Sequence, residues 1–531
     1  MELARIAEES AKGSFSLMLA TAASTVIGAV VVIVIARLLG PSGYGLYSLA
    51  FVLPSLFVSV ADLGVSPSLT RFSASLSSRR EYVRLARMMD SGLILAVLAS
   101  LASYLLSVRF AGPLGGFVLQ RQDMAYLLSV ASVVIVFQEI FTLAYNTLVG
   151  LDHMGQSALM TVLRDLVRLI LSPVLIIVGF GVAGAIAGQV SGWAMAAALG
   201  LCLMLVHRRV LSTTPSDRSS ENGLQENIKT MMVYGLPLYA GTLLGTILSQ
   251  YQTIALAFFT TDAEIGNFRA AINFGSLIGV VATPVVTALF PAFSKLDLET
   301  RKEDLRRLFE YSVKYTTLLI LPAAVVIAAL SKDLIRVVYG SAYGLASTYL
   351  ALYVGTFLLA GLGSQVVGSF LNGVGRTKDT LKITAVQLGI FLPTAPLMAW
   401  LFRVPGLIIA LILSGLVSIS YGLWLSTVRY GMRVDLKSSF AALVAALASA
   451  LPVLLIVYYS VLPSLANVII GGLLYLLAYL TLAPLFGAVK RTDLQTLAPI
   501  LGQIRILRPP TSMVFEYMLR VLDVLDSRKR T

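Results

Sequence analysis

The chain has 531 residues, of which 57% are hydrophobic and only 13% are charged, and its mean hydropathy is +0.86. Soluble domains carry about 25% charged residues, so this composition excludes an ordinary soluble protein and indicates a polytopic membrane protein. The formal net charge of +13 does not indicate nucleic-acid binding, because the basic residues gather in alternate loops between apolar runs. The only cysteine, Cys202, lies in an apolar run. It excludes a disulfide framework and a cysteine metal site.

Apolar runs of about 20 residues, the length that crosses a bilayer, predict an all-α membrane protein with about fourteen transmembrane helices. The predicted spans are 15–36, 44–66, 91–108, 125–149, 161–179, 182–206, 231–258, 264–290, 313–330, 346–371, 381–401, 404–428, 439–461 and 464–487.

Basic residues set the orientation, since they accumulate in cytoplasmic loops. Of the 40 Lys and Arg residues, 31 fall in the segments that include the two termini. We therefore expect both termini to be cytoplasmic. Three lie within spans, Arg164, Arg168 and Arg269, and the six in the predicted outer segments are Arg37, Arg109, Arg121, Lys332, Arg336 and Arg403.

A polar linker, 207–230, follows six spans and precedes eight. Short similarities recur across it at offsets of 221 to 223 residues: GLYSLA from Gly45 with GNFRAA from Gly266, Phe72-Ser73 with Phe293-Ser294, and LVGLDHMGQ from Leu148 with LNGVGRTKD from Leu371. They predict two six-helix bundles of like orientation. The predicted parts are 1–206, the linker, 231–428, two further helices in 429–487, and a cytoplasmic amphipathic tail, 488–531.

The stretch 36–64 reads as a helical hairpin. Gly40, Pro41 and Gly43 mark a tight turn after the first span, because neither residue type continues a helix cheaply. Pro54 then predicts a kink in the second span. We interpret this hairpin as a gate.

Polar side chains inside the spans are the candidates for a substrate cavity, since polar groups in hydrocarbon usually face a cavity or a partner. Each is equally consistent with hydrogen bonding between packed helices. For Arg164, Asp165 and Arg168, a structural ion cluster is the favoured interpretation. The cavity candidates are Asp62, Gln138, Glu139, Asn146, Gln250, Arg269, Asn273 and Gln365.

Motifs of catalysis are missing from the sequence. It has no GxxxxGK[ST] loop, no HExxH and no nucleophile elbow. The two histidines, His153 and His207, lie in loops far apart, which leaves metal binding with almost no ligands. We therefore expect no enzyme activity, no metal and no cofactor. A coupling ion, H⁺ or Na⁺, stays open.

The hairpin ARLLGPSGYGLYSLA, followed by ADLG and Arg71-Phe72, resembles the opening of the polysaccharide biosynthesis and export family. These are Wzx-like flippases of the multidrug/oligosaccharidyl-lipid/polysaccharide superfamily. LNGVGRTKD, from Leu371, is similar to the second-half motif of that family. The resemblance covers nearly the whole chain. It implies two six-helix bundles in a V around a central cavity, with two extra helices.

The resemblance also implies a function in the cell membrane: a polyprenyl-linked oligosaccharide moves from the cytoplasmic to the outer leaflet. Lipid-linked oligosaccharide, membrane lipids and proteins of polysaccharide assembly or oligosaccharide transfer are the implied partners. Three alternatives stay open: a cation-coupled multidrug exporter, a peptidoglycan-precursor flippase and, more remotely, a membrane glycosyltransferase.

Overall fold

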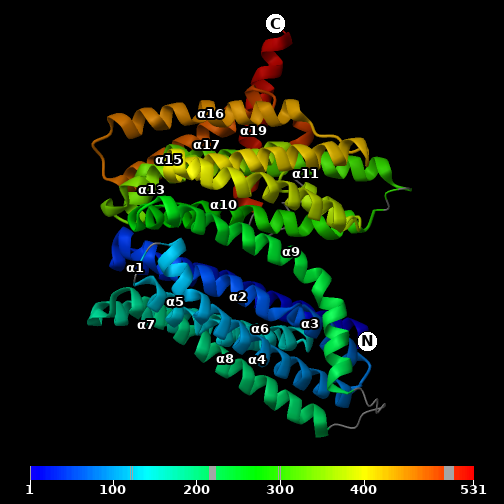
Figure 1. The fold of residues 1–531 in the computed structure, drawn as a ribbon. Coiled ribbons are helices and arrows are strands. Elements are labelled where there is room, and N and C mark those ends of the chain that lie inside the picture. The colour runs from blue at the N-terminus through cyan, green and yellow to red at the C-terminus, as the bar shows by residue number, and fades with distance from the viewer. Residues whose placement is uncertain are drawn as a thin grey trace. The chain divides into compact units, whose positions relative to one another are not determined.

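Every regular element in the described part of the chain is a helix in the computed structural model (Figure 1). The structure describes residues 2–119, 121, 123–213, 223–296, 298, 300–495 and 508–530. Parts of the predicted linker (214–222) and of the predicted tail (496–507) lie outside the described residues.

Two compact units divide the chain, Met1–Gly266 and Asn267–Thr531. Helix α9 thus belongs to the first unit, and α10 crosses from one unit to the next. The elements that begin in the first unit are α1 (Glu2–Ala50), α2 (Val52–Asp62), α3 (Val65–Ser78), α4 (Tyr82–Pro113), the π-helix η1 (Leu114–Val118), α5 (Met124–Ser132), α6 (Val134–Gly150), α7 (Met154–Leu175), the π-helix η2 (Ile176–Phe180), α8 (Gly181–Thr213), α9 (Leu224–Phe259) and α10 (Asp262–Ser294).

The second unit continues from α10 with helices of very different length, from three to 52 residues. They are α11 (Lys302–Ala329), α12 (Ser331–Val338), the 3₁₀-helix η3 (Ser341–Tyr343), α13 (Gly344–Tyr353), the 3₁₀-helix η4 (Val354–Leu362), α14 (Val367–Gly373), α15 (Thr377–Val428), α16 (Leu436–Tyr459), α17 (Ser464–Leu485) and α19 (Arg508–Arg530).

Local sequence explains where these helices break. Helix α1 is two helices joined at a kink, where Gly40 has φ 67° and ψ 176°, a conformation that glycine adopts at no steric cost. Helix α2 ends because Leu63 and Gly64 both take positive φ. Helix α10 begins with a capping box: Thr261 Oγ1 accepts from the Glu264 amide, and the Glu264 carboxylate accepts from the Thr261 amide at 2.9 Å.

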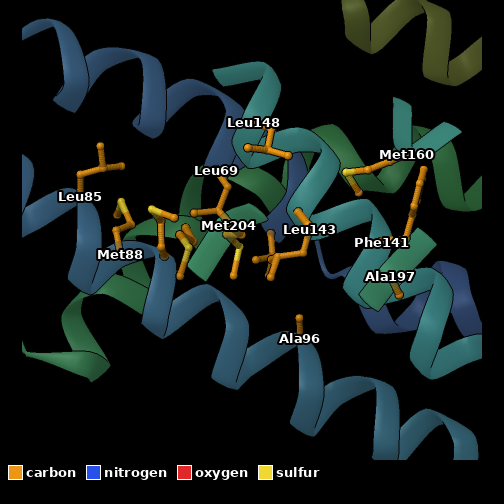
Figure 2. Packing of buried hydrophobic residues seen from close by; sticks show 14 of the residues in the cluster. Leu69, Leu85, Met88, Ala96, Phe141, Leu143, Leu148, Met160, Ala197 and Met204 are labelled. Carbon is orange, nitrogen blue, oxygen red and sulfur yellow. The ribbon is translucent and has the colours of Figure 1, made fainter. Parts of the chain in front are cut away.

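The core of the first unit is apolar and rich in methionine. Figure 2 shows the buried side chains of α3, α4, α6, α7 and α8 gathered between their helices. Leu69 of α3, Met88 of α4 and Leu143 of α6 are at most 1% exposed. This packing fixes the position of α6 relative to α3 and α4.

The second unit has two separate cores. One surrounds three phenylalanines, Phe293, Phe309 and Phe370, whose rings meet edge to face. The other joins α11, α16 and α17, and the apolar face of α19 packs on it through Met518. Helix α19 is therefore docked on its own unit.

Nine helical stretches of the described residues are long and apolar enough to cross a membrane. Three of them, Thr21–Ser78, Met154–Leu211 and Thr377–Val428, have 58, 58 and 52 residues. At 1.5 Å per residue each is long enough for two crossings of a bilayer of about 30 Å. The chain is thus an all-helical polytopic membrane protein, and the count of fourteen spans stays a prediction.

The loop after α6 and the end of α8 lie together. They bring His153 and His207 to a ring-centroid distance of 4.2 Å. The expectation that the two histidines are far apart was wrong, because 54 residues of sequence separation fold into one helical hairpin, α7 and α8.

Candidate translocation site

Two of the predicted carboxylates and a tyrosine form a polar cluster inside the first unit. Glu139 of α6 is fully buried, and neither of its carboxylate oxygens has a hydrogen-bond partner among the described residues. Asp62, the last residue of α2, lies close enough to repel it electrostatically. Tyr239 of α9 interacts electrostatically with both acids, and its buried hydroxyl also has no hydrogen-bond partner among the described residues.

Close backbone contact between α9 and the α2–α3 break positions this cluster. A Cβ on Gly64 would lie 2.3 Å from the carbonyl carbon of Gly235, so only glycine allows the approach. Tyr239 follows Gly235 by four residues and therefore lies one turn further along the same face of α9. Further along, Ser59 Oγ donates to Thr246 Oγ1 at 3.1 Å.

Asp62 is tied into the break that it ends. Its Oδ1 accepts a hydrogen bond from the Ser66 amide at 3.1 Å, so the carboxylate bridges α2 and α3. It is only partly buried. Asp62 therefore has a local structural partner, whereas Glu139 has none within the described part of the chain.

The remaining candidates of the first unit differ in how far their side chains are engaged. Asn146 accepts from Thr70 Oγ1 at 3.0 Å and donates to the Thr142 carbonyl at 2.8 Å, so its amide joins α3 to α6. Gln138 and Gln250 are half-buried. The Asn146 side chain thus has one partner on α3 and one on α6, and Gln138 precedes the buried Glu139 in the sequence.

The predicted gate residues lie at the kink of α1 and in α2. A Cβ on Gly40 would meet nothing within 4 Å, and one on Gly43 would lie 3.1 Å from Leu39 Cβ. Pro41 and Pro54 each occupy a helical segment, and Pro54 is buried. The closest backbone contacts here involve two other glycines: a Cβ on Gly45 would lie 1.9 Å from the Asp262 carbonyl oxygen, and one on Gly266 would lie 1.8 Å from the Pro41 carbonyl oxygen.

The second unit holds Arg269, Asn273 and Gln365. Arg269 and Asn273 are four residues apart on α10 and half-buried, and Arg269 interacts electrostatically with Tyr353 of α13. Gln365 lies in the turn between η4 and α14. The two α10 residues therefore share a helix face, as predicted, and Gln365 is on another element.

Of the predicted ion cluster in α7, the structure shows the pair of Arg164 and Asp165, while Arg168 donates to the Tyr47 hydroxyl at 3.4 Å. Arg164 donates to both carboxylate oxygens of Asp165 at 2.9 Å and stacks over Trp193 at 4.6 Å. Asp165 also accepts from Ser24. Arg164 is therefore fully engaged within the first unit.

Sequence reasoning missed two positions. Tyr239 is one of three tyrosines in the apolar run 231–258, and tyrosine is common near membrane interfaces, so only its packing reveals it. Arg121, predicted as an ordinary outer cation, pairs with Asp262 and donates to the carbonyls of Ala257 and Thr260 at 2.9 and 3.1 Å. It fastens the η1–α5 loop to the α9–α10 turn.

The helical fold is that of the MurJ and MATE structures. The solved structure of the lipid II flippase MurJ in an inward closed conformation superposes with a TM-score of 0.67 at 16% identity, covering 87% of this chain and 97% of that one. A MATE structure in a straight conformation superposes with a TM-score of 0.55 at 17% identity, covering 80% of this chain and 96% of that one.

The chain belongs to the family described as polysaccharide biosynthesis protein, whose sequence profile matches residues 10–297. A second family profile, MatE, matches residues 237–397. A similar relative is the probable low-salt glycan biosynthesis flippase Agl15 of Haloferax volcanii, 22% identical over 71% of this chain and 75% of that protein. Another is the lipopolysaccharide biosynthesis protein WzxC of Escherichia coli, 23% identical over 69% of this chain and 70% of that protein. The protein is thus a multi-pass membrane transporter of the cell membrane and not an enzyme.

Proposed function

We propose that this protein flips a polyprenyl-(pyro)phosphate-linked oligosaccharide from the cytoplasmic to the outer leaflet by alternating access, for assembly of a cell-surface glycan. Its family and its glycan-flippase relatives support this class of substrate. The geometric observation that carries the proposal is Glu139, fully buried and without a hydrogen-bond partner within the described residues. Ionisable groups in that setting usually line a transport path.

The transporter in this proposal has fourteen spans with both termini in the cytoplasm, arranged as 1–206 and 231–428 with two added helices in 429–487. The kinked segment around Gly40, Pro41, Gly43 and Pro54 moves during transport. The tail from 488 stays on the cytoplasmic side. Proteins of polysaccharide assembly or oligosaccharide transfer receive the flipped product.

Each polar group has a proposed part in transport. The cavity shields the sugar from hydrocarbon while the polyprenyl tail stays in lipid. Arg269 holds the phosphate, since guanidinium binds phosphate oxygens in a bidentate manner, and Asn273 supports it. Asp62 and Glu139 bind a coupling ion, H⁺ or Na⁺. Gln138, Asn146, Gln250 and Gln365 line the polar path.

Membrane potential favours the proposed direction. With the cytoplasm negative, moving an anion outward is downhill by about 2.3 kcal/mol per charge for each 100 mV. A doubly charged pyrophosphate linkage therefore gains about twice this amount per 100 mV.

Leaflet-resolved tracking of lipid-linked oligosaccharides tests the proposal. Deleting the gene should make these lipids accumulate on the cytoplasmic side, and the wild-type gene should restore the outer pool. Arg269→Ala should fail to restore it although the protein inserts normally, whereas Arg109→Ala, a change at an exposed cation of α4, should succeed. An unchanged outer pool in the deletion strain would exclude the flippase.

The MatE match over residues 237–397 favours one second candidate, a cation-coupled exporter of small organic cations. Proteoliposomes that hold a fluorescent cationic dye separate the two functions. Dye efflux driven by a proton or sodium gradient, together with normal lipid-linked oligosaccharide in the deletion strain, would select the exporter.

A further inference from the structure

A small basic hollow lies in the second unit, away from the candidate translocation residues. It has a volume of about 140 Å³ and is formed by the short helix α12, the turn after it and the start of α13. The lining residues that matter here are Lys332, Arg336, Gly340, Ser341, Tyr343 and Gly344. By the charge count along the sequence, this end of the unit faces the outer side.

A sharp turn closes the hollow. Gly340 has φ 93°, a conformation that other residues avoid. Its amide donates to the carbonyls of Ile335 and Arg336 at 3.3 and 3.1 Å, which ends α12 and turns the chain back. Below it, Tyr339 and Tyr343 are buried with ring centroids 5.4 Å apart. Backbone hydrogen bonds and buried aromatic side chains therefore hold the wall of the hollow in place.

Both cations of α12 face this hollow without a carboxylate partner among the described residues. Lys332 and Arg336 are four residues apart, hence on one helix face, and both are exposed. Asp333, the acid between them, is 5% exposed and accepts from Asn467 Nδ2 of α17 at 3.4 Å. The Asp333 carboxylate therefore contacts α17 and does not neutralise the two cations of the hollow.

The other polar groups around the hollow add donors. The Ser341 side chain is exposed at the rim. Gly344 is the first residue of α13, a helix end that attracts anions, and the Ala346 amide in this first turn already donates to Asn267 Oδ1 at 2.9 Å. Two cations, a hydroxyl and a helix start together suit the oxygens of a phosphoryl group. The volume accommodates such a group but not an oligosaccharide.

The setting matches a membrane surface. Leu345, beside the hollow, is 49% exposed, so the rim presents an apolar side chain next to the two cations. Only six of the 40 basic residues fall in predicted outer segments, and two of those six line this hollow. Two cations thus lie close together on the predicted outer side, where basic residues are otherwise rare.

We propose that the hollow formed by Lys332, Arg336, Ser341 and the start of α13 binds a phosphoryl group at the membrane surface. The group is carried either by a lipid headgroup or by a soluble phosphate. This inference goes beyond the flippase function, because none of its residues is a transport candidate. Its failure would leave that function untouched.

Binding to the purified full-length chain in detergent tests the site, with dioctanoyl phosphatidic acid and inorganic phosphate as probes in isothermal titration calorimetry. The double variant Lys332→Gln/Arg336→Gln should bind the lipid at least about tenfold more weakly, because it loses two charged donors. Arg109→Gln, which removes another exposed outer cation, should bind like the wild type.

The two probes also identify the source of the phosphate. Lipid binding at least about tenfold tighter than phosphate binding, with phosphate as a competitor, assigns the site to a headgroup, and equal affinities assign it to soluble phosphate. Ser341→Asp, which adds a negative charge at the rim, should weaken both. Wild-type protein that binds neither probe, or a double variant that binds as tightly as wild type, would overturn the proposal.

Discussion

The imidazole rings of His153 and His207, the two histidines of the chain, lie with centroids 4.2 Å apart at the predicted cytoplasmic end of the first unit. His207 Nδ1 is 2.9 Å from the Leu203 carbonyl. Since a carbonyl only accepts, this nitrogen donates. His153 begins the turn into α7, where its carbonyl accepts from the Gln156 amide at 3.0 Å. The two titratable rings therefore lie side by side, and the hydrogen bond to Leu203 fixes the orientation of the His207 ring.

The histidine pair predicts an acid-sensitive fold. Burial and the neighbouring His207 lower the pKa of His153, while Asp152 opposes them. A histidine whose pKa is lower in the folded state stabilises the protein fully above the unfolded value of about 6.5. That stability is lost as the pH falls from about 6.5 towards the folded pKa.

Thermal unfolding of the detergent-purified protein between pH 8 and pH 5 measures this effect. We expect the midpoint temperature to decrease once the pH is below about 6.5. This decrease should be steeper in wild type than in His153→Gln. Arg208, which follows His207 in the sequence, pairs with Asp90 at 2.7 Å, and both residues are kept in the two proteins. Parallel pH profiles in the two proteins would contradict the prediction.

Glu139→Gln separates a transport role from a packing role. The substitution keeps the shape of a fully buried side chain and removes its charge. We expect lipid-linked oligosaccharide flux to fall by about tenfold, within the usual range of coupling energies, while the unfolding midpoint stays the same or rises. Glu226→Gln, at an exposed position in the first turn of α9, is the control. Normal flux in Glu139→Gln would show that this residue serves only packing and has no role in transport.

Much of the fold was accessible from the sequence, because apolar length and helix breakers are local properties. The break at Gly40 falls where the Gly-Pro dipeptide predicts it, and the all-helical polytopic fold follows from composition. The family resemblance was confirmed by the profile match over residues 10–297. Boundaries of the compact units were not accessible, because α9 packs on α2 and α3 through contacts distant in sequence.

The candidate site was predicted less completely. Asp62 and Glu139 stand out because each is an acid in an apolar run, and the structure brings them together. Tyr239 carries no such signal, since its hydroxyl becomes notable only next to the two acids. Asn146 shows the reverse case: an intramembrane amide whose hydrogen bonds are used by Thr70 and Thr142.

The close contact between Gly45 and Asp262 predicts that the hairpin tolerates no side chain at position 45. Any side chain there would push into the backbone of Asp262, with Cβ only 1.9 Å from its carbonyl oxygen. Gly45→Val should therefore destabilise the protein by about 3 kcal/mol, the upper end for overpacking, and reduce flux. Gly28→Ala in the same helix, where a Cβ meets nothing within 4 Å, should leave flux unchanged and keep or raise stability by up to about 1 kcal/mol, because alanine is the better helix former. A Gly45→Val protein with a wild-type unfolding midpoint would refute this close contact.

The final prediction concerns the buried ion pair of Lys314 in α11 and Asp493, whose Nζ and Oδ2 atoms are 2.6 Å apart with side chains 7% and 4% exposed. Removing one partner leaves a buried charge alone, so Lys314→Met should cost about 3–5 kcal/mol in denaturant unfolding. Because replacing both charges is often neutral, Lys314→Met/Asp493→Asn should recover most of that loss. In the wild type the Lys490 amide donates to Asp493 Oδ2 at 2.7 Å, and the side-chain oxygen of the Asn variant can still accept this hydrogen bond. The exposed pair of Arg520 and Glu516, 74% and 66% exposed, is the control, and Arg520→Gln should cost at most about 0.5 kcal/mol. If the double variant is less stable than Lys314→Met alone, the pair is not the reason for the single variant's loss.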